Sequence, residues 1–115
     1  MKTLKEISVA ERDRDAVEEA SRILKEQFPI EQVILFGSKA RGDDDEESDI
    51  DLLLITSRPL SWDERDRITD LLFDVEIAHG VTISTLDVAV TDWTIGIFTL
   101  LPIYGEISKD GAIVA

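Results

Sequence analysis

Two short aliphatic segments constrain the fold of this chain more than any other feature. They are EQVILF at residues 31–36 and IDLLLIT at residues 50–56. Segments of this length, rich in aliphatic residues and separated by a Gly-Ser break, predict two β-strands. Because residues 52–55 are continuously apolar, we expect the second strand to be buried on both faces. The chain therefore needs helices to cover its sheet.

Helical patterns flank the two strands. Apolar side chains recur at helical spacing through residues 9–27, and Pro29 ends that segment. Ser61 followed three residues later by Glu64 is a capping box, which predicts the start of a second amphipathic helix that ends near Gly80. These two helices supply the apolar faces that a buried sheet requires.

The last third of the chain is less regular. The β-branched segment 81–90 predicts a third strand. Residues 93–101 fit irregular structure or a short helix that Asp92 would cap and Pro102 would stop, and we interpret the tail after it as a docking segment. The order helix, strand, strand, helix, strand, helix predicts a small α/β (α+β) sandwich in a single domain over residues 1–115.

Charge is the strongest deviation in composition. The chain has 12 Lys and Arg against 25 Asp and Glu, a formal net charge of −13. Such a surface repels phosphate backbones, so we expect no direct binding to duplex nucleic acid. A basic partner subunit or a salt-adapted source would fit this acidity, and we consider a homo-oligomer as a separate alternative. With no cysteine, no leader-like segment and no long apolar run, we expect a cytoplasmic protein without disulfides, thiolate zinc sites or a membrane partner.

Two aspartates stand at the start of the second aliphatic strand. Asp49 and Asp51 are two residues apart, so in a strand their carboxylates point to the same side. Two like charges beside an apolar sheet are unfavourable unless a cation compensates them. Hard divalent ions such as Mg²⁺ take one or two carboxylates together with phosphate oxygens, and two ions can share such a pair. The spacing predicts a metal site, with two Mg²⁺ ions.

The segment between the strands supplies groups that bind phosphate. Gly37 permits a tight turn and close approach of a ligand to the backbone, and Ser38 offers a hydroxyl and the amides of a following turn. Lys39 and Arg41 either neutralise a bound polyphosphate or balance the acidic residues nearby. We interpret residues 43–47 as a solvated acidic loop with little direct role. Together these groups predict a site for a nucleoside triphosphate such as ATP.

Three better-known motifs do not fit this stretch. Gly37 and Gly42 have the spacing of a P-loop, but Asp43-Asp44 stand where that motif needs Lys and Ser or Thr. A dinucleotide-binding fingerprint needs three glycines, which are absent here. An EF-hand beginning at Asp43 would have Ser48 in place of its glycine and Leu54 in place of its last glutamate. All three are excluded.

The stretch does resemble the signature of a known family. GSKARG at residues 37–42 and SDIDLLLI at residues 48–55 resemble the pattern of DNA polymerase β-like nucleotidyltransferases. They are most similar to the minimal nucleotidyltransferases (MNT), small single-domain proteins often paired with an all-helical HEPN protein. The resemblance extends more loosely over residues 15–115. The residues that stand where the pattern has them are Gly37, Ser38, Ala40, Arg41, Gly42, Ser48, Asp49, Asp51 and Leu52.

The resemblance implies both a fold and a reaction. It implies a mixed β-sheet flanked by helices and the Mg²⁺-dependent transfer of a nucleoside monophosphate to a hydroxyl group. Carried over residue by residue, it implies that Gly37 and Ser38 hold phosphates and that Asp49 and Asp51 bind metal. Members paired with HEPN proteins act as antitoxins, and some adenylylate a tyrosine of the partner.

A third carboxylate is harder to identify. Active members of the family usually carry one on the next strand, where it helps to hold metal and to activate the attacking hydroxyl. In the segment 81–90 the only acid is Asp87, while Thr82 and Ser84 occupy the earlier positions. Asp87 is therefore the candidate third catalytic and metal-binding residue, with Asp74 and Glu76 as alternatives on the preceding segment.

These observations support one leading hypothesis and two alternatives. The leading hypothesis is a Mg²⁺-dependent adenylyltransferase that transfers AMP from ATP to a protein hydroxyl, as the antitoxin of a HEPN/MNT toxin–antitoxin pair. The first alternative is a catalytically inactive nucleotide-binding module that neutralises a helical partner by contact. The second is a free-standing transferase acting on a small molecule.

Overall fold

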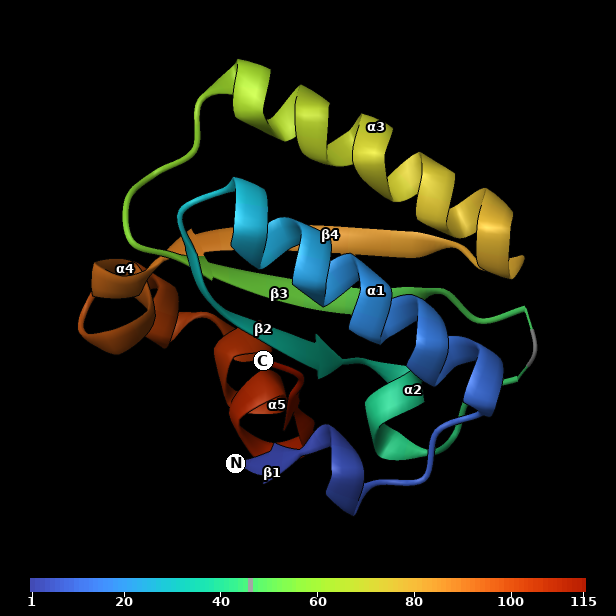
Figure 1. The fold of residues 1–115 in the computed structure, drawn as a ribbon. Coiled ribbons are helices and arrows are strands. Elements are labelled where there is room, and N and C mark those ends of the chain that lie inside the picture. The colour runs from blue at the N-terminus through green and yellow to red at the C-terminus, as the bar shows by residue number, and fades with distance from the viewer. Residues whose placement is uncertain (46) are drawn as a thin grey trace.

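The computed structural model describes every residue except Glu46. Among the described residues, five strands, five α-helices and two 3₁₀ helices follow one another along the chain (Figure 1). In chain order they are β1 (Lys2–Thr3), η1 (Leu4–Glu6), α1 (Glu11–Gln27), β2 (Ile30–Phe36), α2 (Ser38–Arg41), β3 (Ile50–Thr56), α3 (Trp62–His79), β4 (Ile83–Ala89), α4 (Val90–Thr94), η2 (Ile97–Leu100), α5 (Pro102–Asp110) and β5 (Ala112–Ile113).

The strands form one mixed sheet in the order β1-β5-β2-β3-β4. β2 and β3 are antiparallel, and β3 and β4 are parallel because α3 carries the chain back to the start of the sheet. β5 pairs antiparallel with β2 and parallel with β1, so the two ends of the chain meet in the sheet. The strands β2 and β3, whose adjoining ends flank the signature residues, therefore lie in the interior of the sheet.

Helices cover both faces, as the apolar strands require. α1 and α3 pack on one face, where Val17, Leu24 and Ile68 bury against the even-numbered residues of β3. η2, α4 and α5 cover the other face, where Ile107 packs against the odd-numbered residues of β3. The predicted α/β (α+β) fold with a mixed sheet is confirmed. None of the helices in the described part of the chain is both long and apolar enough to cross a membrane.

The C-terminal third differs from the prediction. Pro102 begins α5 instead of stopping a helix, because a proline at the first helical position lacks only an N–H that the helix does not use. Asp92 lies inside the first turn of α4, whose N-cap is Ala89, so it is not the cap that we expected. The two-residue strands β1 and β5 were not predicted, because segments this short carry no periodic signal.

Candidate functional site

The turn after β2 lies directly against Asp51 of β3. Gly37 follows the end of β2 and has a φ of 75°, a conformation that side chains other than glycine rarely adopt. In the β2–β3 register Phe36 is the partner of Asp51, which brings the turn beside the carboxylate. A Cβ on Gly37 would stand 2.2 Å from Asp51 Oδ2. Both the turn and the contact therefore require glycine.

A single helical turn follows, and its first amides face no helical partner. α2 begins at Ser38, and the N–H of Ala40 donates a hydrogen bond to Gly37 O at 3.1 Å. The first N–H groups of any helix have no acceptor within the helix, so those of this turn can receive an anion. The turn closes at Gly42, whose φ of 82° is left-handed. Ser38 is half-buried, and its hydroxyl stands at the start of this turn.

The surroundings of Asp51 disfavour the charged form of its carboxylate. Burial raises the pKa of Asp51, the nearby charge of Asp49 raises it further, and only Arg41 acts to lower it. Asp49 is exposed one residue before β3, while Asp51 is half-buried. A divalent cation would relieve both the burial and the repulsion, and oxygen donors suit Mg²⁺. The two aspartates therefore fit the metal that the sequence suggested.

The position beside Asp51 on the next strand carries a hydroxyl. In the parallel β3–β4 register Asp51 is the partner of Ser84, so Ser84 is the residue of β4 nearest the aspartates on their face of the sheet. Among the described residues, no three His, Cys, Asp or Glu side chains are grouped so that they could hold a metal ion. The third ligand at this position would have to be the neutral oxygen of Ser84 or come from elsewhere.

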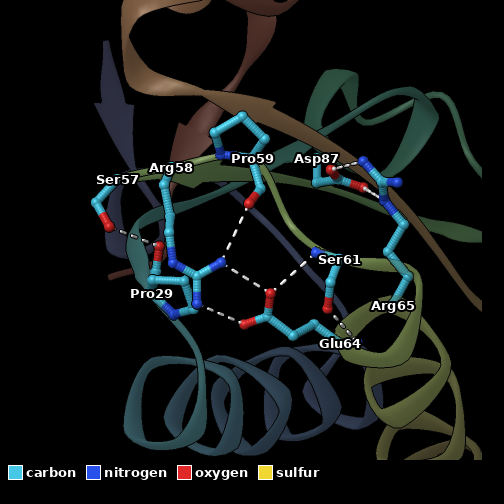
Figure 2. A network of polar contacts seen from close by, with 8 residues as sticks. All are labelled: Pro29, Ser57, Arg58, Pro59, Ser61, Glu64, Arg65 and Asp87. Atoms are coloured by element: carbon cyan, nitrogen blue, oxygen red, sulfur yellow. Dashed lines mark hydrogen bonds and ion pairs between the residues drawn. The ribbon is translucent and has the colours of Figure 1, made fainter.

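Asp87, the candidate third carboxylate, lies away from the aspartate pair. It is the register partner of Leu54 and thus belongs to the opposite face of the sheet from Asp51. Arg65 of α3 binds both its oxygens, with Nε to Oδ1 at 3.2 Å and Nη2 to Oδ2 at 3.0 Å (Figure 2). The structure therefore does not bring Asp87 together with Asp49 and Asp51, and its carboxylate is engaged in joining β4 to α3.

The two alternatives for the third carboxylate lie on α3. Asp74 is an exposed residue of that helix, and Glu76 accepts a hydrogen bond from the backbone N–H of Ile83 at 3.1 Å through Oε2. α3 packs on the face of the sheet opposite to Asp51. Neither alternative is brought to the aspartate pair.

Lys39 is a buried structural cation. Its side chain is 2% exposed, and its Nζ lies 2.8 Å from Asp13 Oδ2 of α1 and 3.1 Å from Asp44 Oδ2. Nζ also donates to Asp45 O at 3.2 Å. Burial alone would lower the pKa of Lys39, but its hydrogen bonds to Asp13 and Asp44 outweigh burial and the pKa is raised. With its donors used in this way, Lys39 does not fit the phosphate-binding role that we expected.

Arg41 is the cation that remains available beside Asp51. Its side chain is largely exposed and donates through Nε to Asp43 Oδ2 at 3.2 Å. This hydrogen bond raises the pKa of Arg41, and the charges of Asp110 and Glu106 on α5 add to the effect. Its charge also acts on Asp51. Arg41 thus interacts electrostatically with Asp51 and with the acidic end of α5, and its exposed side chain can bind an anion.

The acidic loop has a structural role that its composition did not suggest. Glu47 N–H donates to Asp45 Oδ1 at 2.8 Å, and Asp45 N–H donates to Ser48 Oγ at 3.0 Å. Asp44 holds Lys39, so the loop is tied to α1 immediately before Asp49. Glu46, which belongs to the same predicted solvated loop, lies outside the described residues. The described residues of this loop are exposed, as predicted, and Asp44 and Asp45 add contacts to Lys39 that the prediction did not include.

One important residue was missed although a signal for it existed. Asp13 is 2% exposed and is the principal partner of Lys39. It lies one helical turn before Ala16 and Val17, on the stripe of α1 that faces the core. A charged residue on an apolar stripe predicts a buried counter-ion, and applying that rule would have singled out Asp13.

Comparison with known proteins identifies the family of the chain. The family model described as "Polymerase beta, Nucleotidyltransferase" matches residues 18–98. A protein of Methanocaldococcus jannaschii named "Putative protein adenylyltransferase MJ0141" is 38% identical over 66 residues, which cover 57% of this chain and 65% of that protein. The chain thus spans slightly less than two thirds of that relative's length.

Solved structures share the fold. A nucleotidyltransferase from Sulfolobus solfataricus, described as putative, superposes with a TM-score of 0.59 and 20% identity, over 89% of this chain and 78% of that one. A chain from the complex of a tri-AMPylated Shewanella oneidensis HEPN toxin with an MNT antitoxin gives a TM-score of 0.55 and 14% identity, over 88% and 70%. At these identities the likeness shows a common architecture.

Proposed function

This chain belongs to the polymerase β nucleotidyltransferase family, and we propose that it transfers AMP from ATP to a hydroxyl group of a protein partner. The observation that carries the proposal is the contact of the Gly37 turn with Asp51. This contact brings the turn that would bind phosphate beside the carboxylate that would bind metal. That combination suits a bound nucleoside triphosphate and little else.

The chemistry follows from these positions. A hydroxyl oxygen of the acceptor bonds to the α-phosphorus, the bond from that phosphorus to the bridging oxygen of the β-phosphate breaks, pyrophosphate leaves with the electron pair of that bond, and the hydroxyl proton passes to solvent water. Ser38 and the amides of its turn would hold the phosphates, and Arg41 would offset their charge. Asp49 and Asp51 would hold Mg²⁺, which stabilises the charge that develops on the transferred and leaving phosphate oxygens.

Three observations support ATP and a protein acceptor. The relative from M. jannaschii carries the name of a protein adenylyltransferase. One structural neighbour is a toxin–antitoxin complex with AMP-PNP, and another contains an AMPylated HEPN toxin. The net charge of −13 further disfavours an anionic nucleic acid as the acceptor. We therefore propose a helical protein of the HEPN class as the partner and acceptor, with this chain as the antitoxin.

A labelling experiment tests this function. The protein is incubated with Mg²⁺, ATP labelled at the α-phosphate, and a purified helical protein of the HEPN class. We expect the partner to gain one or more AMP units by intact mass, with release of pyrophosphate. The matched control is Asp49→Asn/Asp51→Asn, which should leave the partner unlabelled. Equal labelling by this double variant would contradict the assignment of the site.

Ser84 favours a second candidate function. Where active members of the family usually carry a third carboxylate, the strand beside Asp51 presents a hydroxyl. A site of this kind could retain nucleotide but turn it over slowly or not at all, so that the chain neutralises its partner by contact. The two functions separate cleanly in one assay. Inhibition of the partner without nucleotide indicates the binding module, whereas inhibition that needs ATP and Mg²⁺ indicates the transferase.

A further inference from the structure

β4 forms an open edge of the sheet. It is the last strand in the sheet order, and its only strand partner in the described part of the chain is β3. It runs for seven residues in continuous register, without a bulge, a proline or a lysine. Edge strands usually carry such devices to prevent pairing with another chain. A charge is another such device, but the one charged residue of β4, Asp87, is paired with Arg65, so residues 84–89 leave a template for a further strand.

The outward backbone groups can be identified. Thr82 O accepts from Ile50 N–H at 2.8 Å, so in a parallel pair the even-numbered residues of β4 turn their backbone groups toward β3. The odd-numbered residues then face outward. Glu76 already accepts from the N–H of Ile83. Thr85 and Asp87 are therefore the central residues whose N–H and C=O groups point out of the sheet.

An apolar stripe on α3 runs beside this edge. Trp62, Phe73 and Ile77 are 78%, 59% and 70% exposed, on a helix whose other exposed positions are mostly charged or polar. They share one flank of the helix by their spacing. Arg65 lies over the Trp62 ring at 5.2 Å and also binds Asp87, which places this flank next to β4.

We propose that a second copy of this chain pairs with β4 in antiparallel register about a two-fold axis at Leu86. In that register Thr85 of each copy exchanges backbone hydrogen bonds with Asp87 of the other, because both residues face outward. Leu86 lies opposite Leu86 of the other copy. This is the non-hydrogen-bonded pair between the two Thr85–Asp87 pairs, where side chains approach most closely. The two sheets join into one continuous sheet.

The helices fit the same axis. α3 runs antiparallel to β4, because Arg65 contacts Asp87 and Glu76 contacts Ile83. Residues 68 and 69 of α3 therefore lie level with Leu86. The apolar stripe extends from Trp62 to Ile77 and has its midpoint at residues 69 and 70. The rotation that pairs the strands thus sets Trp62 of one copy opposite Ile77 of the other, which is the self-complementarity that an isologous interface needs.

A groove is present where the opposing tryptophan would arrive. A cavity of about 580 Å³ opens beside Phe73 and Ile77, and Gly80 and Val81 form part of its lining. The lining is mixed, with Arg12, Glu47 and Glu76 beside these apolar residues, and an exposed tryptophan, apolar in its ring and polar at its N–H, is a usual anchor in such a groove. The same groove on each copy would receive Trp62 of its neighbour.

Charge distinguishes a second copy from another partner. Asp87 is the only charged residue of β4 and pairs with Arg65, so the negative charge on this edge comes from the Glu76 carboxylate at Ile83, in a chain of net charge −13. Two copies repel each other at long range, and salt screens this repulsion. Self-association should therefore strengthen as NaCl rises. Binding of a basic partner would weaken under the same change.

Sedimentation velocity of the full chain tests the proposal. We expect a dimer, at twice the 12.9 kDa of the chain, at micromolar concentrations in 0.5 M NaCl, with a smaller dimer fraction in 20 mM NaCl. The variant Phe73→Glu/Ile77→Glu should raise the dissociation constant at least about 100-fold. The matched control Ile95→Glu/Leu100→Glu changes comparably exposed apolar residues outside α3 and β4 and should sediment like the wild type.

A backbone variant separates strand pairing from loss of apolar surface. Thr85→Pro removes an N–H that the monomer does not use, so a folded monomer by circular dichroism is the expected result. The proposal is overturned by a wild type that stays monomeric at both salt concentrations. It is also overturned by a control variant that dissociates while Phe73→Glu/Ile77→Glu remains dimeric, or by a folded Thr85→Pro that remains dimeric.

Discussion

Gly37 and Asp51 are in direct contact across the β2–β3 pair, and the space between them is too small for a side chain. A Cβ at position 37 would lie 2.2 Å from Asp51 Oδ2, far inside the van der Waals limit. The carboxylate in this contact is half-buried and has a raised pKa. Glycine at position 37 is therefore needed both for the turn that would bind phosphate and for the position of the carboxylate that would bind metal.

Gly37→Ala should impair the site more than its small size suggests. The substitution strains a backbone with φ of 75° and displaces Asp51, and we expect a loss of about 1–3 kcal/mol in the free energy of unfolding together with weaker ATP binding. Urea titration and calorimetric ATP binding measure the two effects. Gly105→Ala is the control, because it lies inside α5 with nothing within 4 Å of an added Cβ and should stabilise by about 0.5–1 kcal/mol.

Asp51→Asn should abolish AMP transfer without harming the fold. Removing a metal ligand costs more than the roughly 10–100-fold typical of its supporting residues, so we expect at least about a 100-fold fall in the transfer rate. Because the Asp51 carboxylate is destabilised by burial and by Asp49, the Asn variant should melt at or above the wild-type temperature without metal. Adding MgCl₂ should raise the melting temperature of the wild type alone, and an equal rise for Asp51→Asn would remove Asp51 from the metal site.

Ser84→Asp should increase transfer. The substitution places a carboxylate beside Asp51 in the β3–β4 register, at the position that Asp87 does not supply. Tighter Mg²⁺ binding and a higher rate are expected, and both follow from titration of the rate against MgCl₂. Thr85→Asp is the control, because its side chain lies on the opposite face. An unchanged or lower rate in Ser84→Asp would show that the site lacks something other than a third acid.

Lys39→Met should destabilise the protein strongly. It removes the closer cation of the buried Asp13 and leaves Arg12 Nε at 3.7 Å from Oδ1, and breaking a buried pair costs about 3–5 kcal/mol. Adding Asp13→Asn should recover part of the loss, because the stranded charge is then removed. Arg41→Met is the matched surface control and should cost about 0–1 kcal/mol, since its pair with Asp43 is exposed. Chemical denaturation of the four proteins measures these values.

The sequence predicted the elements whose signals are periodic or carry a cap. The capping box of Ser61 and Glu64 is present and starts α3 at Trp62, and the strand predicted at residues 50–56 is β3 residue for residue. The ion pairs of Lys39 and Asp87 could not be predicted from periodicity or from caps. Both depend on cations and anions brought together from distant segments, Lys39 by Asp13 of α1 and Asp87 by Arg65 of α3. Local patterns give the residue types at a site but not the partners that tertiary packing delivers.

The pair of Arg58 and Glu64 predicts a specific dependence of stability on pH. Hydrogen bonds from Arg58, and then from Ser61, lower the pKa of Glu64 to about 2 from a model-peptide value of 4.5 (Figure 2). A carboxylate with a lowered pKa in the folded state stabilises the fold above pH 4.5, and this contribution is lost as the pH falls from 4.5 toward about 2. Thermal melts of Glu64→Gln should show a smaller loss of stability over that interval than the wild type.

Asp63→Asn serves as the control for this measurement. Asp63 is the exposed neighbour of Glu64 in the first turn of α3. Its variant should follow the wild-type pH dependence closely. A Glu64→Gln curve that runs parallel to that of the wild type between pH 5 and about 2 would remove this pair from the acid sensitivity of the fold.

The buried ion pair between Lys39 and Asp13 has a consequence for how such chains can diverge. The position between Gly-Ser and Ala-Arg looks free to vary in the signature, yet its side chain reaches the inner stripe of α1. A single substitution at either position strands a buried charge, whereas a joint change to two apolar residues does not. Residues 13 and 39 should therefore covary among relatives, as an acid with a base or as an apolar pair. A deep alignment that shows them varying independently would contradict this coupling.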